Sequence, residues 1–393
     1  MTDFQKDFIG LINSALNGTV AEVSDDFDWN HAYNCAKSHQ ITPLLYYGIT
    51  NSKLTIPAEI KSKFENATMQ NIVLNQNQMY FLKVLFATFE KEDISYMPLK
   101  GTLLKKVYPK PEMRAMSDAD ILIKEDEYSK IRPVMEALGY TERYESDHEL
   151  VWKKGVLTVE LHKSIIPTYH KDYFNYFGNG WKLASEKIGK FGYKMKHEDE
   201  LIYNFTHLAK HYRAGGIGIK HITDVYVCFP KDKKLDYDYI ESELRALKLW
   251  DFFSNILDTV KVWFGTKEAT EKTDFITDYI FSSGAYGTSE NQNIGEALKT
   301  AQNVGGSKNV MKSRRLSLIF PPYKTMCKRN PIVKKYPLLL PVMWVVRWFE
   351  VLIFKRNKID KVMKNLNEMT RENIDTFEKS LEYVGLTFNF EEK

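Results

Sequence analysis

Two carboxylates stand at the start of a short apolar segment in the sequence RAMSDADILI, which runs from Arg114 to Ile123. Successive side chains of a strand point to opposite faces, so Asp118 and Asp120 share one face while Ala119 and Ile121 point to the other. Like charges this close repel each other, and such a pair usually holds a cation or shares a proton. The stretch therefore indicates chemistry at the start of a buried strand.

A third carboxylate lies in a second strand-like segment, VLTVELH, which covers residues 156–162. Glu160 and His162 share one face of that segment. If the two strands are neighbours, Glu160 meets Asp118 and Asp120. Mg²⁺ prefers oxygen ligands and is usually shared with substrate phosphates, so this cluster favours phosphoryl or nucleotidyl transfer over a structural metal site. Mn²⁺ is an alternative ion, and His162 is either a partner of Glu160 or a contact to the substrate.

An element that could hold phosphate precedes the carboxylates. The run ISYMPLKG ends a strand at Gly101, and a short helix is predicted to begin at Thr102. Glycine lets a phosphate approach the backbone, and N–H groups at the start of a helix favour anions. Lys100 either assists triphosphate binding or pairs with a carboxylate. Arg114 either grips the substrate or is a surface or structural residue.

The order of these motifs resembles the polymerase-beta-like nucleotidyltransferase superfamily, and within it a bacterial family of uncharacterised nucleotidyltransferases. The motifs that carry the resemblance are Leu99-Lys100-Gly101, Tyr108, Arg114, Asp118-x-Asp120, Gly139-Tyr140 and Glu160-Leu161-His162. They cover residues 97–165, with a looser likeness in the helical flanks. The chain departs from the superfamily in its phosphate loop, where Lys100-Gly101-Thr102 replaces the usual Gly-Gly or Gly-Ser.

This resemblance implies a mixed sheet in which Asp118 and Asp120 bind one or two Mg²⁺ ions. Glu160 would complete the triad, as a ligand or as the base near the attacking hydroxyl. Lys100, Gly101, Thr102 and Arg114 would bind the nucleotide.

Hydrophobic periodicity predicts helical regions on both sides of a core of alternating strands and helices. Together with the mixed sheet that the resemblance implies, this predicts an α+β fold with a central mixed β-sheet core. We expect an N-terminal helical region over residues 1–75, a nucleotidyltransferase core over 76–195 and a C-terminal helical region over 196–393. A helix is predicted from about Asn71 to Glu92, followed by strand, helix, strand, helix and a hairpin.

Three further polar residues lie in the C-terminal helical region. His207 and His211 are four positions apart on a predicted helix, a spacing that can bind metal, contact a nucleotide or substrate, or simply belong to an interface. Asp224 is predicted to cap or anchor the helix that contains it.

The formal charge of +4 hides a strongly basic block. Residues 308–364 carry fifteen Lys and Arg side chains against two acids, a net of +13. Such a block suggests an anionic partner, here an anionic membrane surface or an anionic substrate, although a solvated surface remains the alternative. Within it, residues 336–354 predict a buried helix, an interfacial helix or, least of all, a membrane span, because Arg347 and Glu350 fall inside.

Composition places the chain in the cytoplasm, with peripheral attachment to the inner face of the membrane as an alternative. The three cysteines lack metal-type spacing, and the N-terminus lacks the features of a secretion signal.

We predict a Mg²⁺-dependent enzyme that moves an NMP from an NTP to a hydroxyl or phosphate of an unknown acceptor, namely a small molecule, glycan precursor or protein. No zinc-finger or helix-turn-helix signature occurs, so no template nucleic acid is expected. The alternatives are a non-catalytic nucleotide-binding module and a membrane-surface accessory protein of polysaccharide assembly.

Overall fold

The computed structural model describes residues 1–168, 170–229, 234–288, 290–295, 319–354 and 371–386. The chain forms two compact units. The first is built from Met1–Lys210, Ile217–Ala285 and the described residues from Tyr383 onward. The second holds His211–Gly216 and the described part of Tyr286–Glu382.

Four helices open the first unit: α1 (Asp3–Asn17), α2 (Trp29–Ser38), α3 (Thr42–Asn51) and α4 (Ala58–Lys91). A capping box formed by Thr2 and Gln5 begins α1, and Gly18 ends it in the left-handed conformation that glycine adopts without strain. The predicted helix over 71–92 corresponds to the second half of α4, and the first half of α4 lies in the predicted N-terminal helical region. Residues 75 and 76 both lie inside this helix, so the expected boundary between regions falls within one continuous element.

A five-stranded sheet follows, in the order β1-β2-β5-β4-β3. Its strands are β1 (Tyr96–Pro98), β2 (Ala119–Ile123), β3 (Thr141–Glu145), β4 (Glu149–Lys154) and β5 (Leu157–His162). The pairing of β2 with β5 is parallel and the other pairings are antiparallel, which confirms the predicted mixed sheet and α+β class. The sequence-based prediction missed β3, because its residues are mostly polar and exposed and so lack an apolar face.

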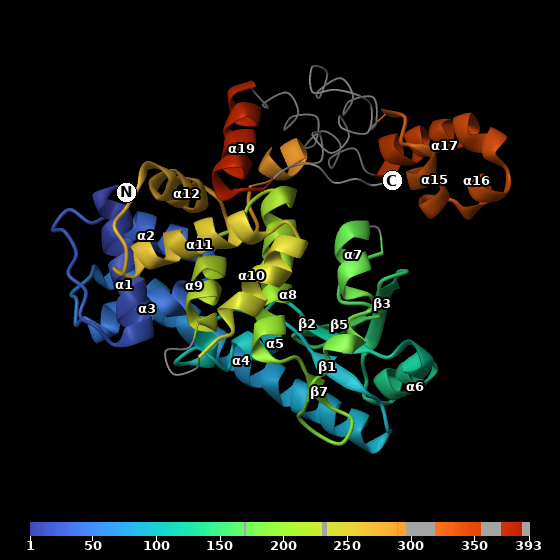
Figure 1. Ribbon diagram of the computed structural model, residues 1–393, viewed down its shortest axis with the longest axis horizontal. Coiled ribbons are helices and arrows are strands. Elements are labelled where there is room, and N and C mark those ends of the chain that lie inside the picture. The colour runs from blue at the N-terminus through green and yellow to red at the C-terminus, as the bar shows by residue number, and fades with distance from the viewer. Residues whose placement is uncertain (169, 230–233, 289, 296–318, 355–370, 387–393) are drawn as a thin grey trace. The chain divides into compact units, whose positions relative to one another are not determined.

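One face of the sheet packs on the second half of α4 and on α6 (Tyr128–Ala137) (Figure 1). Three short helices come between β1 and α6 in the chain: α5 (Gly101–Leu104), η1 (Pro111–Met113) and η2 (Glu125–Glu127). The buried cluster on this face of the sheet includes Leu82, Leu85, Phe89, Ile121, Ile131, Val159 and Leu161. Because side chains alternate along a strand, burying Ile121, Val159 and Leu161 on this face turns the intervening polar residues toward the other.

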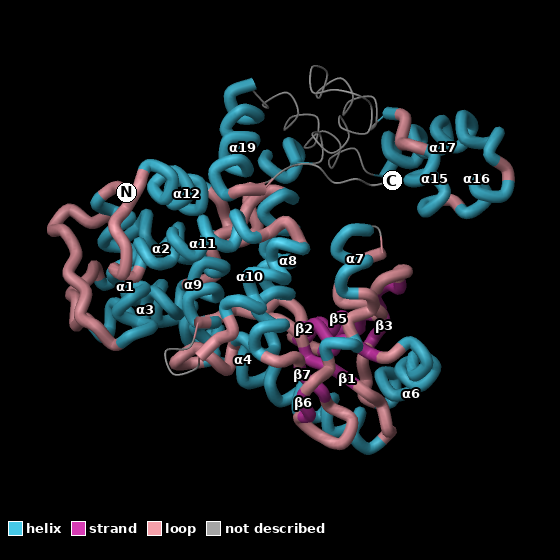
Figure 2. Tube along the Cα trace, in the orientation of Figure 1, coloured by secondary structure: helices cyan, strands magenta, loops and turns pink. Residues whose placement is uncertain are grey.

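Helices make up most of the rest of the first unit, and the sheet lies at one end of it (Figure 2). The elements are α7 (Lys171–Phe177), η3 (Trp181–Leu183), β6 (Glu186–Lys187), β7 (Tyr193–Lys194), α8 (His197–Ala214, which belongs to this unit up to Lys210), α9 (Ile219–Cys228), α10 (Tyr237–Ala246), α11 (Trp250–Trp263) and α12 (Glu271–Ser282). The end of this series returns to the N-terminus: the Gln5 side-chain amide donates to Asp278 over 2.8 Å, and Phe8 packs edge-on against Phe281. Helices from both ends of the first unit therefore form one layer.

The described part of the second unit includes α15 (Tyr323–Arg329), α16 (Pro331–Lys335), η5 (Pro337–Leu339) and α17 (Leu340–Phe354), with most of α19 (Arg371–Val384). Leu338, Val342 and Phe349 are exposed, which argues against the buried-helix alternative for this segment. No described helix combines the length and apolar character needed to cross a bilayer. The remainder of the predicted basic block, 308–318 and 355–364, lies outside the described residues.

Candidate active site

The two strands that carry the acidic motifs are neighbours. Parallel pairing of β2 with β5 places Asp120 directly opposite Glu160, and Leu122 opposite His162. Asp120 and His162 are buried, whereas Glu160 is half-buried. The structure thus brings together the carboxylates of two motifs 40 residues apart in the chain.

Asp118 lies two residues before Asp120 and is half-buried. Burial raises the pKa of the Asp118 carboxyl, and the neighbouring charge of Asp120 raises it further. Burial likewise raises the pKa of Glu160 to about 8, with added repulsion from Asp118 and Asp120. Negative charge in this cluster is therefore incompletely compensated by the protein, a situation that a divalent cation would relieve.

Asp120 is the carboxylate that the protein does compensate. Lys100 donates from Nζ to Asp120 Oδ1 over 2.9 Å, and His162 Nε2 lies 2.8 Å from the same oxygen. Burial by itself would raise the pKa of Asp120, but the charge of Lys100 and the contact with His162 outweigh it and hold that pKa below its usual range. Of the two roles predicted for Lys100, the structure shows the pairing with a carboxylate. Its role in triphosphate binding stays a prediction.

The backbone around Lys100 is unusual. Lys100 has φ 43° and ψ −116°, a region that favours glycine, just before the single turn of α5. Gly101 follows, and a Cβ atom at that position would lie 2.8 Å from Nη1 of Arg114. Glycine at this position avoids that close contact. Thr102 is buried, and its hydroxyl has no hydrogen-bond partner in the described part of the chain.

Arg114 forms an ion pair with Asp224. Its Nε and Nη2 donate to the two oxygens of Asp224 over 2.8 and 3.0 Å, and Tyr108 donates its hydroxyl to Asp224 over 2.7 Å. Arg114 is buried rather than a surface residue, and the partner that the structure shows for it is Asp224. Asp224 anchors α9 to the core, as predicted. The nucleotide-binding role predicted for Arg114 gains no support from this geometry.

The predicted histidines of α8 fall in different units. His207 is half-buried on the first unit, with its ring 6.4 Å from that of Tyr203. His211 belongs to the second unit, where its ring lies 5.6 Å from that of Tyr286. Their contact with a substrate stays a prediction.

Two further lysines, Lys210 and Lys220, lie near the carboxylates. Burial lowers the pKa of Lys210 to about 8, assisted by the nearby charge of Lys100. Lys220 is buried, donates to Gln40 over 3.0 Å and opposes the rise in the pKa of Asp118. Helices α8 and α9 each contain a single lysine, and the fold brings both lysines near the carboxylates.

The ligand atoms available here fit a divalent cation. Asp120, Glu160 and His162 each offer an atom within 4.8 Å of the others. Carboxylate oxygens are ligands for hard cations. Burial and repulsion between the carboxylates raise the pKa values of Asp118 and Glu160, and a bound cation would offset that repulsion.

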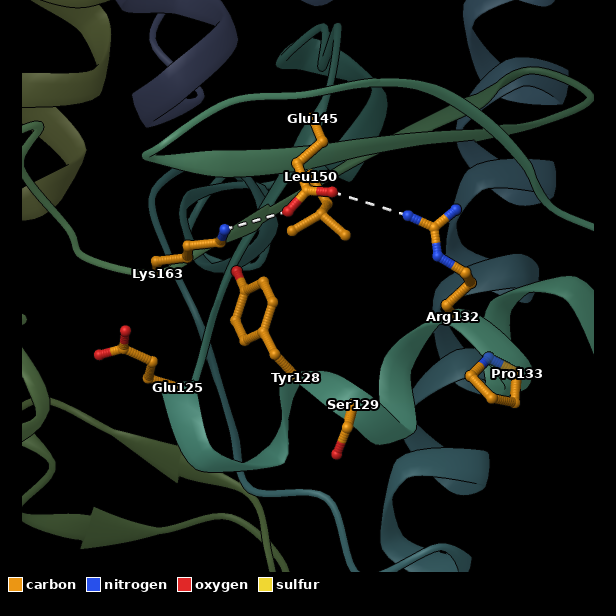
Figure 3. Close-up of a pocket in the computed structure, with 8 residues that line it drawn as sticks. All are labelled: Glu125, Tyr128, Ser129, Arg132, Pro133, Glu145, Leu150 and Lys163. Carbon is orange, nitrogen blue, oxygen red and sulfur yellow. Dashed lines mark hydrogen bonds and ion pairs between the residues drawn. The ribbon is translucent and has the colours of Figure 1, made fainter.

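A separate hollow of about 550 Å³ lies beside α6 (Figure 3). Its lining residues are Glu125, Tyr128, Ser129, Arg132, Pro133, Glu145, Leu150 and Lys163. Glu145 lies between two cations, 3.1 Å from Lys163 and 3.6 Å from Arg132. The carboxylate cluster does not line this hollow, and both of its cations, Lys163 and Arg132, are paired with Glu145.

A family model described as "uncharacterised nucleotidyltransferase" matches residues 25–265, well over half of the chain. That interval contains all the acidic motifs described above and both elements of the Arg114–Asp224 pair. The chain matches no curated protein and no solved structure at a significant level.

Proposed function

The chain belongs to the family of uncharacterised nucleotidyltransferases, and from that premise we propose that it moves an NMP from an NTP to an acceptor in a Mg²⁺-dependent reaction. The observation that carries the proposal is the register of β2 and β5, which sets Asp120 opposite Glu160 with Asp118 beside them. Mn²⁺ is the natural substitute ion, because the same oxygen ligands suit it.

Asp118, Asp120 and Glu160 would hold the metal. When bound, Mg²⁺ would neutralise charge on the triphosphate during in-line attack at the α-phosphorus, with pyrophosphate as the leaving group. Lys100 keeps Asp120 ionised and in place through its 2.9 Å hydrogen bond. Glu160 would also be the candidate base for the proton of the attacking hydroxyl.

The acceptor is proposed by class: a hydroxyl or phosphate of a small molecule, a glycan precursor or a protein. Template nucleic acid is not part of the proposal. The half-buried Lys210 and the buried Lys220 supply positive charge near the carboxylates, as an NTP would require.

The test is label transfer from each α-radiolabelled NTP, with Mg²⁺ and a lysate of the source cell as the supply of acceptors. Asp118→Asn/Asp120→Asn keeps the side-chain shapes but removes two metal-binding charges. We expect turnover to fall by at least about 100-fold, because a catalytic metal supplies several kcal/mol of charge stabilisation. Asp126→Asn is the matched control, since Asp126 is an exposed acid of the following turn.

Equal transfer by the wild type and the double variant would rule the proposal out. Mg²⁺-dependent NTP binding without transfer to any lysate component would instead support the alternative of a non-catalytic nucleotide-binding module. Isothermal titration of the same two proteins with each NTP separates these outcomes.

A second candidate function, docking on an anionic membrane surface, is favoured by the segment of residues 319–354 in the second unit. Its large exposed apolar side chains are Ile319, Phe320, Tyr323, Ile332, Tyr336, Leu338, Val342, Val345, Val346 and Phe349. The same segment carries six Lys and Arg residues and one acid. Apolar side chains interspersed with cations suit the headgroup boundary of a bilayer that contains anionic lipid.

Co-sedimentation with vesicles tests this docking. We expect the protein to sediment with phosphatidylserine-containing vesicles and not with pure phosphatidylcholine. Lys334→Glu/Lys335→Glu should weaken sedimentation. Leu338→Asp, which leaves both lysines in place, should weaken it as well. The charge-matched control is Lys37→Glu/Lys83→Glu, two exposed lysines of α2 and α4. The docking would be contradicted if the protein bound both kinds of vesicle equally and if neither Lys334→Glu/Lys335→Glu nor Leu338→Asp weakened that binding.

A further inference from the structure

A second group of ligand atoms lies beside the carboxylate cluster. His148, Glu149 and His162 each offer one atom within 4.8 Å of the others. Glu149 and His162 are directly opposite in the pairing of β4 with β5, and His148 lies in the turn just before β4. The backbone holds this turn in place, because Lys163 N–H donates to the carbonyl of His148 over 2.8 Å.

The hydrogen bonds of His148 determine which of its ring nitrogens carries hydrogen. Nδ1 lies 3.3 Å from Oγ of Ser164. That hydroxyl already donates to the carbonyl of Ile166 over 2.8 Å, so toward His148 it acts as an acceptor. Nδ1 of His148 therefore carries the hydrogen, and Nε2 presents a lone pair.

The same reasoning applies to His162. Its Nε2 lies 2.8 Å from Asp120 Oδ1, and Lys100 keeps that carboxylate ionised, so Nε2–H is the donor. In neutral His162, Nδ1 then presents a lone pair. This atom lies 3.3 Å from Nε2 of His148 and 3.4 Å from Oε2 of Glu149.

Glu149 is oriented in a matching way. Tyr144 donates its hydroxyl to Oε1 over 2.7 Å, which leaves Oε2 directed at the two imidazoles. Three acceptor atoms thus face one another with no hydrogen between them. The lone pairs of these three atoms repel one another unless a cation lies between them.

We propose that His148 Nε2, Glu149 Oε2 and His162 Nδ1 bind a transition-metal ion of the Zn²⁺ class, at a site distinct from the proposed Mg²⁺ site. Ligands about 2.1 Å from one tetrahedral ion lie about 3.4 Å from each other, which the observed 3.3 and 3.4 Å match. Imidazole nitrogen suits Zn²⁺, Co²⁺ or Ni²⁺ better than Mg²⁺. The inference stands on these contacts and does not depend on nucleotidyl transfer.

Each ligand also has the outer partner that metal sites typically show: Ser164 for His148, Tyr144 for Glu149 and Asp120 for His162. His162 binds the ion through one nitrogen and Asp120 through the other. The ion therefore positions His162, and through it one carboxylate of the proposed active site.

Cobalt provides the test, because Co²⁺ bound to imidazole absorbs visible light. The full-length chain without an affinity tag is stripped with a chelator, then equilibrated with Co²⁺ in a large excess of Mg²⁺ that fills oxygen-only sites. We expect one equivalent of Co²⁺ by elemental analysis, with a visible absorption band. His148→Ala and Glu149→Gln should each weaken Co²⁺ binding by more than about 100-fold, and Ser164→Ala by about 10- to 100-fold.

Controls separate this site from others. Asp118→Asn, at the proposed Mg²⁺ site, should keep the cobalt band, as should His31→Gln, an exposed histidine, and His207→Gln on α8. Far-UV circular dichroism verifies that each variant is folded, and Glu149→Gln keeps the shape of the original side chain. The inference is overturned if no Co²⁺ is retained in excess Mg²⁺, which would mean that a proton on His162 fills the gap. It is also overturned if the band survives both His148→Ala and Glu149→Gln.

Discussion

Arg114 holds both carboxylate oxygens of Asp224 by hydrogen bonds of 2.8 and 3.0 Å, across a sequence separation of 110 residues. Tyr108 adds a third bond to the same carboxylate. All three residues are buried. The pair fastens the loop before β2 to α9, and the guanidinium held in this way lies 2.8 Å from where a Cβ atom at position 101 would be, which favours glycine there.

Breaking this pair should cost much of the protein's stability. Arg114→Ala leaves the carboxylate of Asp224 buried without its cation, and we expect the free energy of unfolding to fall by about 3–5 kcal/mol. Urea unfolding followed by circular dichroism measures the loss. The double variant Arg114→Met/Asp224→Leu removes both charges and should recover part of it. If Arg114→Ala unfolds like the wild type, the pair is not structural.

Two substitutions of Lys100 should differ in stability. Both Lys100→Gly and Lys100→Ala remove the hydrogen bond to Asp120, but only glycine tolerates φ 43° and ψ −116° without strain. We expect Lys100→Gly to be the more stable of the two by about 1 kcal/mol, reversing the usual advantage of alanine. Urea midpoints of the two variants decide this. An alanine variant as stable as the glycine variant would show that the backbone relaxes at no cost.

The pH dependence of stability should carry a contribution from His39. Burial lowers the pKa of His39 to about 4 from the ordinary 6.5, although a contact with the carbonyl of Phe281 opposes the shift. The backbone N–H of Ile219 donates to Nδ1 of His39, which requires the neutral ring. Below pH 6.5, His39 takes up a proton in the unfolded chain but stays neutral in the folded chain. The free energy of unfolding therefore falls as the pH falls from 6.5 toward 4.

The expected size is about 3 kcal/mol between those two pH values, from a shift of about 2.5 pKa units. Urea unfolding at closely spaced pH values, compared between wild type and His39→Gln, isolates the contribution. The variant should show a flatter profile over this window. Identical profiles would mean that His39 accepts a proton in the folded protein.

Cysteine labelling should reveal one reactive thiol. Cys35 and Cys228 are buried, and burial raises the pKa of Cys35 to about 12 and that of Cys228 well above its ordinary value. Cys327 is half-buried. With a chromogenic disulfide reagent at pH 8, we expect one fast equivalent per chain and two that react at least about 100-fold more slowly, because the thiolate is the reactive form. Cys327→Ser should abolish the fast phase, and its persistence would contradict the assignment.

The sequence predicted the elements whose pattern is local. Alternation in SDADILI and VLTVELH indicated two strands with polar and apolar faces, and the structure has β2 and β5 there, with Ile121 and Val159 in the core. The acidic motifs and the order of helices and strands also carried the family resemblance, which the family match over residues 25–265 confirms. Edge strand β3 was missed because an exposed polar strand has no such pattern.

Which side chains meet was decided by the tertiary structure alone. The sequence showed Arg114 near two aspartates, yet its partner is Asp224, because the folded chain brings α9 to the loop before β2. The sequence predicted the hairpin that β4 and β5 form, but the contacts of His148 and Glu149 with His162 depend on the register of that hairpin and on side-chain packing. Local spacing determines a residue's face on its own strand or helix, whereas its charge partners come from segments far away in sequence, and only packing brings these together.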